Sequence, residues 1–246
     1  AALAAGICSA GADVVLCGVL PTPAIAYLTS KYKYDAGVMI SASHNSYEYN
    51  GIKFFSGNGL KLSDEIEDEI ERTVNEYDIY SKSRPVGEDV GTVIRRPESA
   101  RQYVEHLKRR MSVDLSGMRI AMDCANGAAS AIAPSLFEDL GATVIAIGNT
   151  PNGLNINKNC GSTHLEQLSM TVISEKCDIG LAFDGDADRF LGIDETGKVI
   201  DGDVIMSIIA SDMKENGELN SDTIVVTVMS NLGLDIYASD AGIKLA

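Results

Sequence analysis

The chain has 246 residues, of which 45% are hydrophobic and 22% charged, and its 20 basic and 35 acidic residues give a formal net charge of −15. This composition is typical of a globular protein with one large or two ordinary domains. The excess of negative charge argues against a general nucleic-acid binder or a binder of anionic membranes, and no apolar run approaches the roughly 20 residues that span a bilayer. We therefore expect neither nucleic acid nor membrane as a partner.

The cysteines give no sign of an oxidising compartment. They are Cys8, Cys17, Cys124, Cys160 and Cys177. Their number is odd and they include no CxxC pair, so the sequence suggests neither a disulfide framework nor a zinc knuckle. A reducing cytoplasm is the expected location. The chain lacks an initiator methionine and the basic start of a signal peptide, and both ends look cut within an element, so we interpret it as a fragment of a longer protein.

Apolar runs and chain breakers near the start predict an α/β organisation. A helix over 1–10 is followed by a strand at 14–19, a helix at about 23–30 and a strand at 37–40. This order implies parallel pairing of the two strands, with helices on the faces of the sheet. The second strand runs into the small polar loop 41–46, and open α/β sheets bind their ligands outside the carboxyl ends of strands.

The same plan recurs further along the chain. Residues 81–97 lack periodicity and are interrupted by proline and glycine, which indicates a boundary. A second β-α-β series starts after Gly117, and a third unit starts near Asp201. The expected fold class is α/β, with consecutive three-layer α/β/α domains and mixed, mostly parallel sheets. The predicted domains are a partial first domain at 1–96, a second at 97–200 and the start of a third at 201–246.

The polar connection at 148–164 belongs to the predicted second domain. It is too long for an ordinary connector. Its length suggests a function, and its residues do not identify one.

The stretch 178–189 carries the clearest chemistry, because a strand-like apolar run ends there in three carboxylates. Asp184, Asp186 and Asp188 alternate with small residues, which let the backbone curl so that the carboxylates converge on one hard cation such as Mg²⁺, Ca²⁺ or Mn²⁺. Arg189 follows directly. A guanidinium beside a metal is suited to hold a phosphate that the metal also touches.

Three other interpretations of this stretch compete with this one. An acidic surface loop does not usually follow a run as apolar as 179–183. An EF-hand would use Glu195 at position twelve, but it requires glycine where Arg189 stands, and the flanks are predicted strands. A phosphatase of the haloacid dehalogenase type would use Asp184 as nucleophile and Asp186 as acid. That phosphatase stays open as the second hypothesis.

The serine loop and the carboxylate loop follow strands of different segments, so they could face one another across a domain cleft. Together they predict phosphoryl transfer, with Ser43 as nucleophile and carrier and a metal on the three aspartates polarising its phosphate. Arg189 and Lys53 would balance charge or move a proton. For His44 a base, a hydrogen-bond donor and a plain loop residue all stay open.

These residues also carry a resemblance. The stretch Ser41–Asn45 with Asn50–Lys53 resembles the phosphoserine loop of the α-D-phosphohexomutases, and Asp184–Arg189 resembles their metal loop. Further stretches resemble the branch of that superfamily that interconverts glucosamine 6-phosphate and glucosamine 1-phosphate: 20–23, 123–128 and 155–164.

The resemblance implies an enzyme that acts on a sugar phosphate. Ser43 would be phosphorylated in the working enzyme, and this phosphoserine and the three aspartates would bind Mg²⁺. Arg189 would contact the phosphate, while His44 and Lys53 would support proton transfer at the sugar hydroxyl. Phosphate would pass from Ser43 to the sugar monophosphate and return to it through a bisphosphate intermediate, with no net consumption.

The chain departs from the superfamily at several points. Ser46 stands where proline usually follows His-Asn, which loosens the loop backbone. The N-terminal strand with its early basic residue, the sugar-reading loop of the third domain and the fourth domain are missing. We therefore expect this chain alone to bind metal but to have little or no mutase turnover. A phosphoglucomutase or phosphomannomutase stays an alternative, because the sugar choice depends on resemblance.

Overall fold

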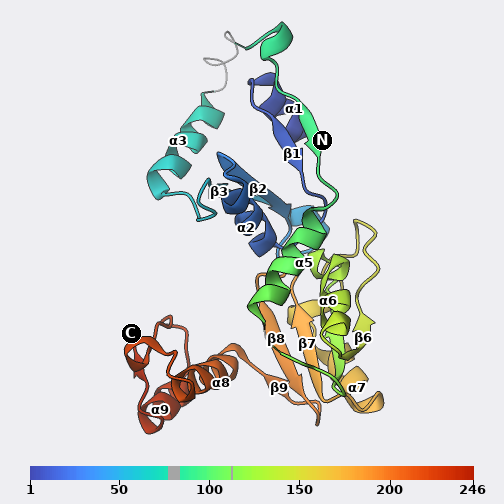
Figure 1. The fold of residues 1–246 in the computed structure, drawn as a ribbon, viewed down its shortest axis with the longest axis vertical. Helices are drawn as coiled ribbons and strands as arrows, with labels where there is room; N and C mark the ends of the chain where they lie inside the picture. The colour runs from blue at the N-terminus through green and yellow to red at the C-terminus, as the bar shows by residue number, and fades with distance from the viewer. Residues whose placement is uncertain (77–83, 112) are drawn as a thin grey trace.

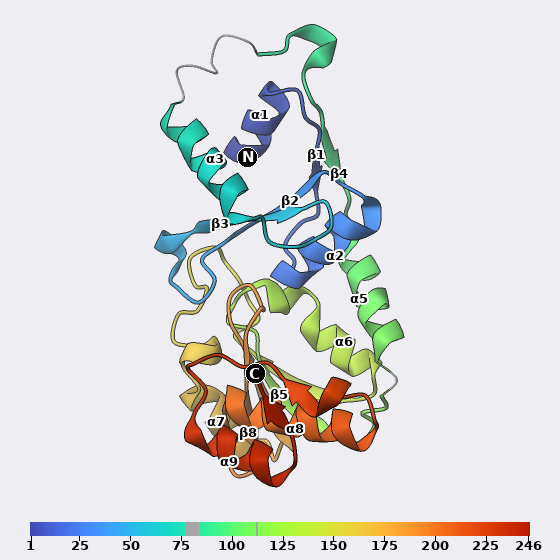
Figure 2. The same cartoon turned by 90° about the vertical axis from the view of Figure 1, so that its left-hand side faces the viewer.

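The computed structural model describes residues 1–76, 84–111 and 113–246, and within these residues the strands form four sheets (Figure 1). The first elements lie above the five-stranded sheet in Figure 1, and α8 and α9 lie to its left. In Figure 2, where that left-hand side faces the viewer, α8 and α9 lie in front of the sheet. The α/β fold class expected from the sequence is confirmed. The domain boundaries stay predictions, and the proposed break at 81–97 lies partly outside the described residues.

The first unit contains the serine loop. Its elements are α1 (Ala2–Ser9), β1 (Val14–Leu16), α2 (Thr22–Tyr32), β2 (Ala36–Ser41), β3 (Gly51–Ser56), α3 (Asp64–Asn75) and β4 (Val93–Arg95). The first strand is shorter than predicted because Gly18 takes a φ of 84° and Pro21 follows. Pro23 lies in the first turn of α2, where the backbone N–H that proline lacks would form no intrahelical hydrogen bond.

The predicted parallel pairing of the first two strands is wrong. β2 pairs antiparallel with β3 over six residues, and β1 pairs parallel with β4. The chain turns back within residues 42–50, so β3 returns along the edge of β2 in the opposite direction. This hairpin holds the serine loop at one end of the β2–β3 pair.

The second unit is a five-stranded mixed sheet with a helix layer on each face. Its strands stand in the order β6-β5-β7-β8-β9. β6, β5 and β7 are parallel, β8 runs antiparallel to β7, and β9 runs antiparallel to β8. The elements are α5 (Ser99–Arg110), β5 (Arg119–Asp123), α6 (Ala133–Asp139), β6 (Thr143–Ile147), α7 (Glu166–Ser174), β7 (Ile179–Phe183), β8 (Phe190–Asp194) and β9 (Val199–Ile200).

Alternation along β5 supplies both cores of this sheet. Ile120 and Met122 pack on one face with Ala133 of α6, while Ala121 packs on the other with Leu168 and Val172 of α7. Successive side chains of a strand point to opposite faces, so a strand that is apolar throughout needs cover on both sides. The result is the three-layer arrangement.

One further apolar cluster joins the first unit to the second. Leu20, Ala24 and Leu28 of the first unit pack with Tyr103 of α5 and Ile132, which precedes α6. All five side chains are buried. This contact fixes the position of the serine loop relative to the five-stranded sheet.

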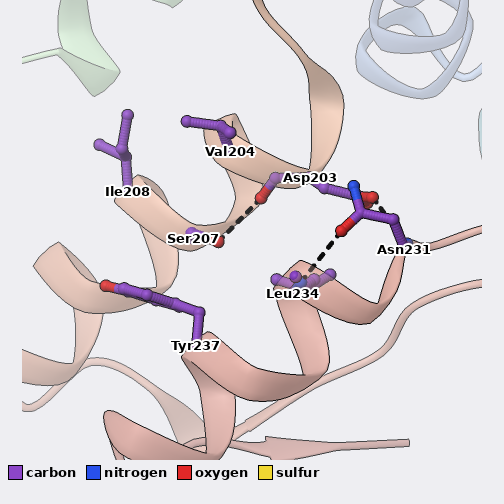
Figure 3. Close-up of a pocket in the computed structure, with 8 residues that line it drawn as sticks. Asp203, Val204, Ser207, Ile208, Asn231, Leu234 and Tyr237 are labelled. Atoms are coloured by element: carbon purple, nitrogen blue, oxygen red, sulfur yellow. Dashed lines mark hydrogen bonds between the residues drawn. The ribbon is translucent and has the colours of Figure 1, made fainter.

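The third unit holds α8 (Gly202–Glu215), β10 (Thr223–Ile224), α9 (Leu232–Asp240) and β11 (Lys244–Leu245). A pocket of about 350 Å³ lies between the two helices (Figure 3). At its rim, Asp203 Oδ2 accepts a hydrogen bond of 2.8 Å from the amide of Asn231, whose side chain caps α9 at Leu234.

The remaining short elements are 3₁₀ turns at Tyr47–Tyr49, Gly87–Asp89, Ala128–Ala131, Gly161–Thr163 and Asn220–Asp222. Among the described residues, none of the helices has both the length and the apolar character to cross a membrane.

Candidate active site

The two loops singled out in the sequence meet in the structure. The carboxylate loop connects the antiparallel strands β7 and β8, and the serine loop follows β2. The amide of Gly185 donates a hydrogen bond of 3.1 Å to the carbonyl of Ser43, and the amide of Thr22 donates to the carbonyl of Asp186 at 2.9 Å. Main-chain contacts from the first unit therefore hold the carboxylate loop in place.

The three aspartates form a compact cluster. One oxygen from each of Asp184, Asp186 and Asp188 lies within 4.8 Å of the others. Asp184 and Asp186 are fully buried, which excludes the surface-loop interpretation. Asp186 Oδ1 is buried and has no hydrogen-bond partner among the residues that the structure describes. A buried carboxylate oxygen without a donor, beside two further carboxylates, fits a hard divalent cation.

Two cations of the chain contact this cluster. Lys53 Nζ lies 2.6 Å from Asp186 Oδ2 and 2.7 Å from Asp188 Oδ2. Arg189 Nε lies 3.3 Å from Asp184 Oδ2 and 3.8 Å from Asp188 Oδ1. Lys53 comes from β3 and Arg189 from the carboxylate loop itself, so both units contribute positive charge.

Ser43 lies directly beside the aspartates. Its Oγ is 3.4 Å from Asp184 Oδ2 and accepts a hydrogen bond of 3.2 Å from Arg189 Nη2. The same Arg189 nitrogen contacts His44 Nδ1. Ser43 has a φ of 52°, a left-handed conformation that is uncommon for residues other than glycine and that recurs at functional sites. The structure thus brings together all seven side chains that the sequence predicted.

The environment shifts the ionisation of these groups in different directions. Burial raises the pKa of Asp184, and the neighbouring charge of Asp186 adds to this rise. Burial alone would raise the pKa of Asp186, but hydrogen bonds from Lys53 and Thr22 outweigh it and lower the pKa. Burial alone would lower the pKa of Lys53, but its hydrogen bonds to Asp186 and Asp188 raise the pKa overall. Lys53 is therefore a proton donor or a fixed charge at neutral pH, not a base.

Sequence reasoning missed Thr22 and Asn157. The Thr22 hydroxyl donates to Asp186 Oδ2, and the Asn157 amide donates to the carbonyls of Ser43 and Asn45, at 2.7 Å each. The unusual length of the 148–164 loop and the resemblance of 155–164 pointed to the stretch that contains Asn157 without giving that residue a role.

Asp123 lies in the resembling stretch 123–128, but the sequence indicated no role for it. It is fully buried at the end of β5 and accepts hydrogen bonds from the amides of Ala125 at 2.9 Å and Gly161 at 2.7 Å. It thereby ties both the loop after β5 and the 148–164 loop to the sheet. Burial raises the pKa of Asp123.

The strands that flank the carboxylate loop exclude the EF-hand. That motif requires a helix on each side, whereas β7 and β8 are paired over five residues from Ile179 to Phe183.

Comparison with known protein families decides among the remaining hypotheses. Three family models match in succession: phosphoglucomutase/phosphomannomutase alpha/beta/alpha domain I at residues 1–81, domain II at 101–197 and domain III at 201–246. The chain belongs to the phosphoglucomutase/phosphomannomutase family. The resemblance to the α-D-phosphohexomutases is therefore confirmed, and the dehalogenase-type phosphatase is not favoured.

The similar family members include two clostridial proteins named phosphoglucosamine mutase. The chain is 54% identical to that of Clostridium acetobutylicum over 244 residues, which cover 99% of this chain and 54% of the relative. It is 51% identical to that of Clostridioides difficile over 246 residues, covering all of this chain and 55% of the relative. The chain thus spans about half the length of these relatives.

Solved structures of the family share the fold. A phosphoglucomutase/phosphomannomutase family protein from Burkholderia thailandensis matches with a TM-score of 0.80 at 26% identity, covering 99% of this chain and 53% of that one. The N-acetylphosphoglucosamine mutase of Aspergillus fumigatus, crystallised with GlcNAc-6P and magnesium, matches with a TM-score of 0.58 at 19% identity, covering 92% of this chain and 58% of that one.

Proposed function

We propose that the protein interconverts glucosamine 6-phosphate and glucosamine 1-phosphate, with Ser43 as the carrier of the phosphoryl group. The observation that carries the proposal is the convergence of Ser43 Oγ, the Asp184 carboxylate and the Arg189 guanidinium from loops 141 residues apart in the sequence. The sugar is chosen from the relatives named phosphoglucosamine mutase at 51–55% identity.

Each catalytic side chain has a role that follows from its position. In the first half-reaction the bond between phosphorus and Ser43 Oγ breaks, and a bond from phosphorus to the free hydroxyl of the sugar monophosphate forms. Arg189 would bind the phosphate oxygens at Ser43 through its planar guanidinium. The hydroxyl proton would leave to a nearby base, for which His44 is the candidate, since Lys53 stays protonated.

The second half-reaction restores the enzyme. The bisphosphate presents its other phosphate to Ser43 Oγ, the sugar–phosphate bond breaks, and the phosphoserine forms again. Lys53, protonated and in contact with two carboxylates, would donate a proton to the departing sugar oxygen and regain one from the Ser43 hydroxyl as its Oγ attacks. The proton that His44 took in the first half-reaction would pass to Ser43 Oγ when its bond to phosphorus breaks, so both side chains return to their starting state. The phosphate count of enzyme and sugar is unchanged over the cycle.

Mg²⁺ is the proposed metal, held by Asp184, Asp186 and Asp188 and by the phosphate on Ser43. When bound, it supplies positive charge that stabilises the phosphoryl group during transfer. Oxygen donors of this kind suit a hard cation. The cytoplasmic location stays a prediction, as does the weak turnover of this chain alone.

Phosphopeptide mapping tests the carrier. The intact protein is analysed by mass spectrometry as purified and after incubation with glucosamine 1,6-bisphosphate. We expect phosphate on Ser43, lost in Ser43→Ala and kept in Ser46→Ala, a control in the same loop. Phosphate on Asp184 with Ser43 unmodified would establish the phosphatase hypothesis instead, and phosphate on neither residue would overturn the proposal.

Turnover with three sugar phosphates tests the specificity. We expect the intact protein to convert glucosamine 6-phosphate with a higher kcat/KM than glucose 6-phosphate or mannose 6-phosphate. A preference for glucose or mannose would assign the protein to the phosphoglucomutase or phosphomannomutase alternative.

A further inference from the structure

Asn157 reaches across from the second unit to the backbone of the serine loop. Its side-chain amide donates one hydrogen bond of 2.7 Å to the carbonyl of Ser43 and another of 2.7 Å to the carbonyl of Asn45. A primary amide carries two N–H donors, so one side chain can bridge two carbonyls. Asn157 is only 7% exposed, and buried donors that lose their partners are costly.

The support beneath Asn157 is rigid. The backbone amide of Asn157 donates a hydrogen bond of 2.8 Å to the carbonyl of Ala125, and its φ is 56°. Four residues further on, Gly161 donates to Asp123 Oδ2. The 148–164 loop is therefore tied to the end of β5. The left-handed conformation of Asn157 suits its residue type, because asparagine tolerates this conformation better than most residues.

The serine loop needs such support. Ser43 also takes a left-handed φ of 52°, a conformation that is unfavourable for a residue with a Cβ. A strained conformation persists only where the surroundings over-determine it. Two donors meet the Ser43 carbonyl, the amide of Gly185 at 3.1 Å and the side chain of Asn157 at 2.7 Å.

The place of the Ser43 side chain depends on where the backbone of this loop lies. A shift of that backbone would carry Ser43 Oγ away from Asp184 and Arg189, which lie 3.4 and 3.2 Å from it. The amide of Gly185 binds one carbonyl of the loop, that of Ser43, whereas the Asn157 side chain binds the carbonyl of Asn45 as well. Asn157 thus restrains both ends of the turn that carries the reactive serine.

We propose that Asn157 is a positioning residue for phosphoryl transfer, which holds Ser43 Oγ in line with the carboxylate cluster by bridging the carbonyls of Ser43 and Asn45. This inference rests on the proposed function. It gives the long 148–164 loop a role that its sequence did not reveal: this loop carries the side chain through which the second unit sets the geometry of the serine loop.

The test compares Asn157→Asp with Asn155→Asp in the intact protein. Both substitutions keep side-chain size and remove amide donors. The Asn155 side chain donates within its own loop, to the carbonyl of Thr150 at 3.0 Å, so it is the matched control. Asn157→Asp also introduces a negative charge. Asn157→Gly removes the same two hydrogen bonds without adding charge and tolerates the positive φ, so it separates the two effects.

We expect kcat to fall about 10- to 100-fold in both Asn157 variants while KM changes less than about threefold, because a displaced nucleophile slows the chemical step rather than binding. Transfer of phosphate from glucosamine 1,6-bisphosphate to Ser43 should slow by the same factor. Mg²⁺ affinity, measured by calorimetry, should stay unchanged, and Asn155→Asp should resemble the wild type.

Two results would overturn the inference. One is wild-type kcat in both Asn157 variants. The other is an equal loss in Asn155→Asp or a fall in Mg²⁺ affinity, which would indicate general disruption of the loop. A wild-type protein that shows neither turnover nor phosphate on Ser43 would instead refute the proposed function, so the two failures are distinguishable.

Discussion

Lys53 and Arg189 divide the negative charge of the carboxylate loop between them. Lys53 Nζ bridges Asp186 and Asp188, whereas Arg189 is closest to Asp184. An exposed ion pair contributes little to stability. Asp184 and Asp186 are fully buried, however, and a buried carboxylate that loses its partner is costly. The same positive charge also repels a metal ion that approaches these oxygens.

Lys53→Met should therefore have two opposite effects. We expect the protein to unfold at a lower temperature without metal, because Asp186 loses its ion pair, and to bind Mg²⁺ more tightly, because a competing cation is gone. Thermal melting and calorimetric titration measure the two effects. Lys61→Met is the control, since Lys61 forms an exposed ion pair with Glu67. Weaker Mg²⁺ binding in Lys53→Met would show that the lysine orients the carboxylates instead of competing for them.

Thiol reactivity should separate the buried cysteines from the others. Burial raises the pKa of Cys124 to about 12 and that of Cys160 to about 11. Only the thiolate reacts with iodoacetamide, so both residues should stay unlabelled in the folded protein at pH 8, whereas the partly exposed Cys17 reacts. Peptide mapping after alkylation, with a urea-unfolded sample as control, checks this. Labelling of Cys124 at the rate of Cys17 would contradict the buried core around β5.

The residues of the candidate site could be singled out from the sequence because their pattern is local. Three carboxylates spaced by small residues after a strand have few uses other than binding a cation. Thr22 and Asn157 could not be predicted, since their hydrogen bonds join residues 164 and 114 positions apart. A single threonine or asparagine carries no local pattern, and its partner is decided only when the units pack.

At the scale of the elements, helix α2 lies unusually close to strand β2. A Cβ added at Gly37 would stand 2.2 Å from Thr29 Oγ1, and Thr29 is buried and donates to the carbonyl of Ile25 at 2.8 Å. The β-branched Thr29 side chain has little rotamer freedom in a helix. The packing of α2 on β2, and with it the start of the serine loop, depends on the missing Cβ.

Gly37→Ala should lower the free energy of unfolding by about 1–3 kcal/mol, the usual cost of overpacking. Gly51→Ala in the paired strand β3 is the matched control, because its Cβ would lie 3.7 Å from the nearest atom, the carbonyl of Ser41. It should be neutral within about 0.5 kcal/mol. Urea denaturation followed by circular dichroism measures both. Equal midpoints for the two variants would contradict the close approach.

Element boundaries and element pairing differed in how well the sequence predicted them. Strand β7, at Ile179–Phe183, matches its predicted apolar run because both faces of that strand are covered. The predicted parallel pairing of the first two strands was wrong, since β1 pairs with β4 and β2 with β3, because local pattern does not say which edge a strand will use. The turn within residues 42–50 decided it.

At the scale of the whole molecule, the candidate site lies where the first and second units meet. Lys53 and the amide of Thr22 reach from the first unit to Asp186, and the amide of Gly185 reaches back to the carbonyl of Ser43. The apolar cluster of α2 and α5 holds the same two units together from another side. A ligand that fixes the carboxylate loop should therefore stabilise both units.

Mg²⁺ should raise the melting temperature of the protein through this site. A ligand that binds only the folded state adds about 2.7 kcal/mol at a free concentration of 100 times its Kd. Asp186→Asn should abolish the Mg²⁺ effect, because it removes a buried ligand oxygen. Asp139→Asn, which removes an exposed partner of Lys108 far from the cluster in sequence, should keep the Mg²⁺ effect.

Melting curves recorded with and without Mg²⁺ at constant ionic strength separate specific binding from screening. An equal Mg²⁺ shift in Asp186→Asn and Asp139→Asn would mean that the ion acts on the net charge of −15 and not at the three aspartates. A shift confined to the proteins that retain Asp186 would mean that the ion binds at the three aspartates.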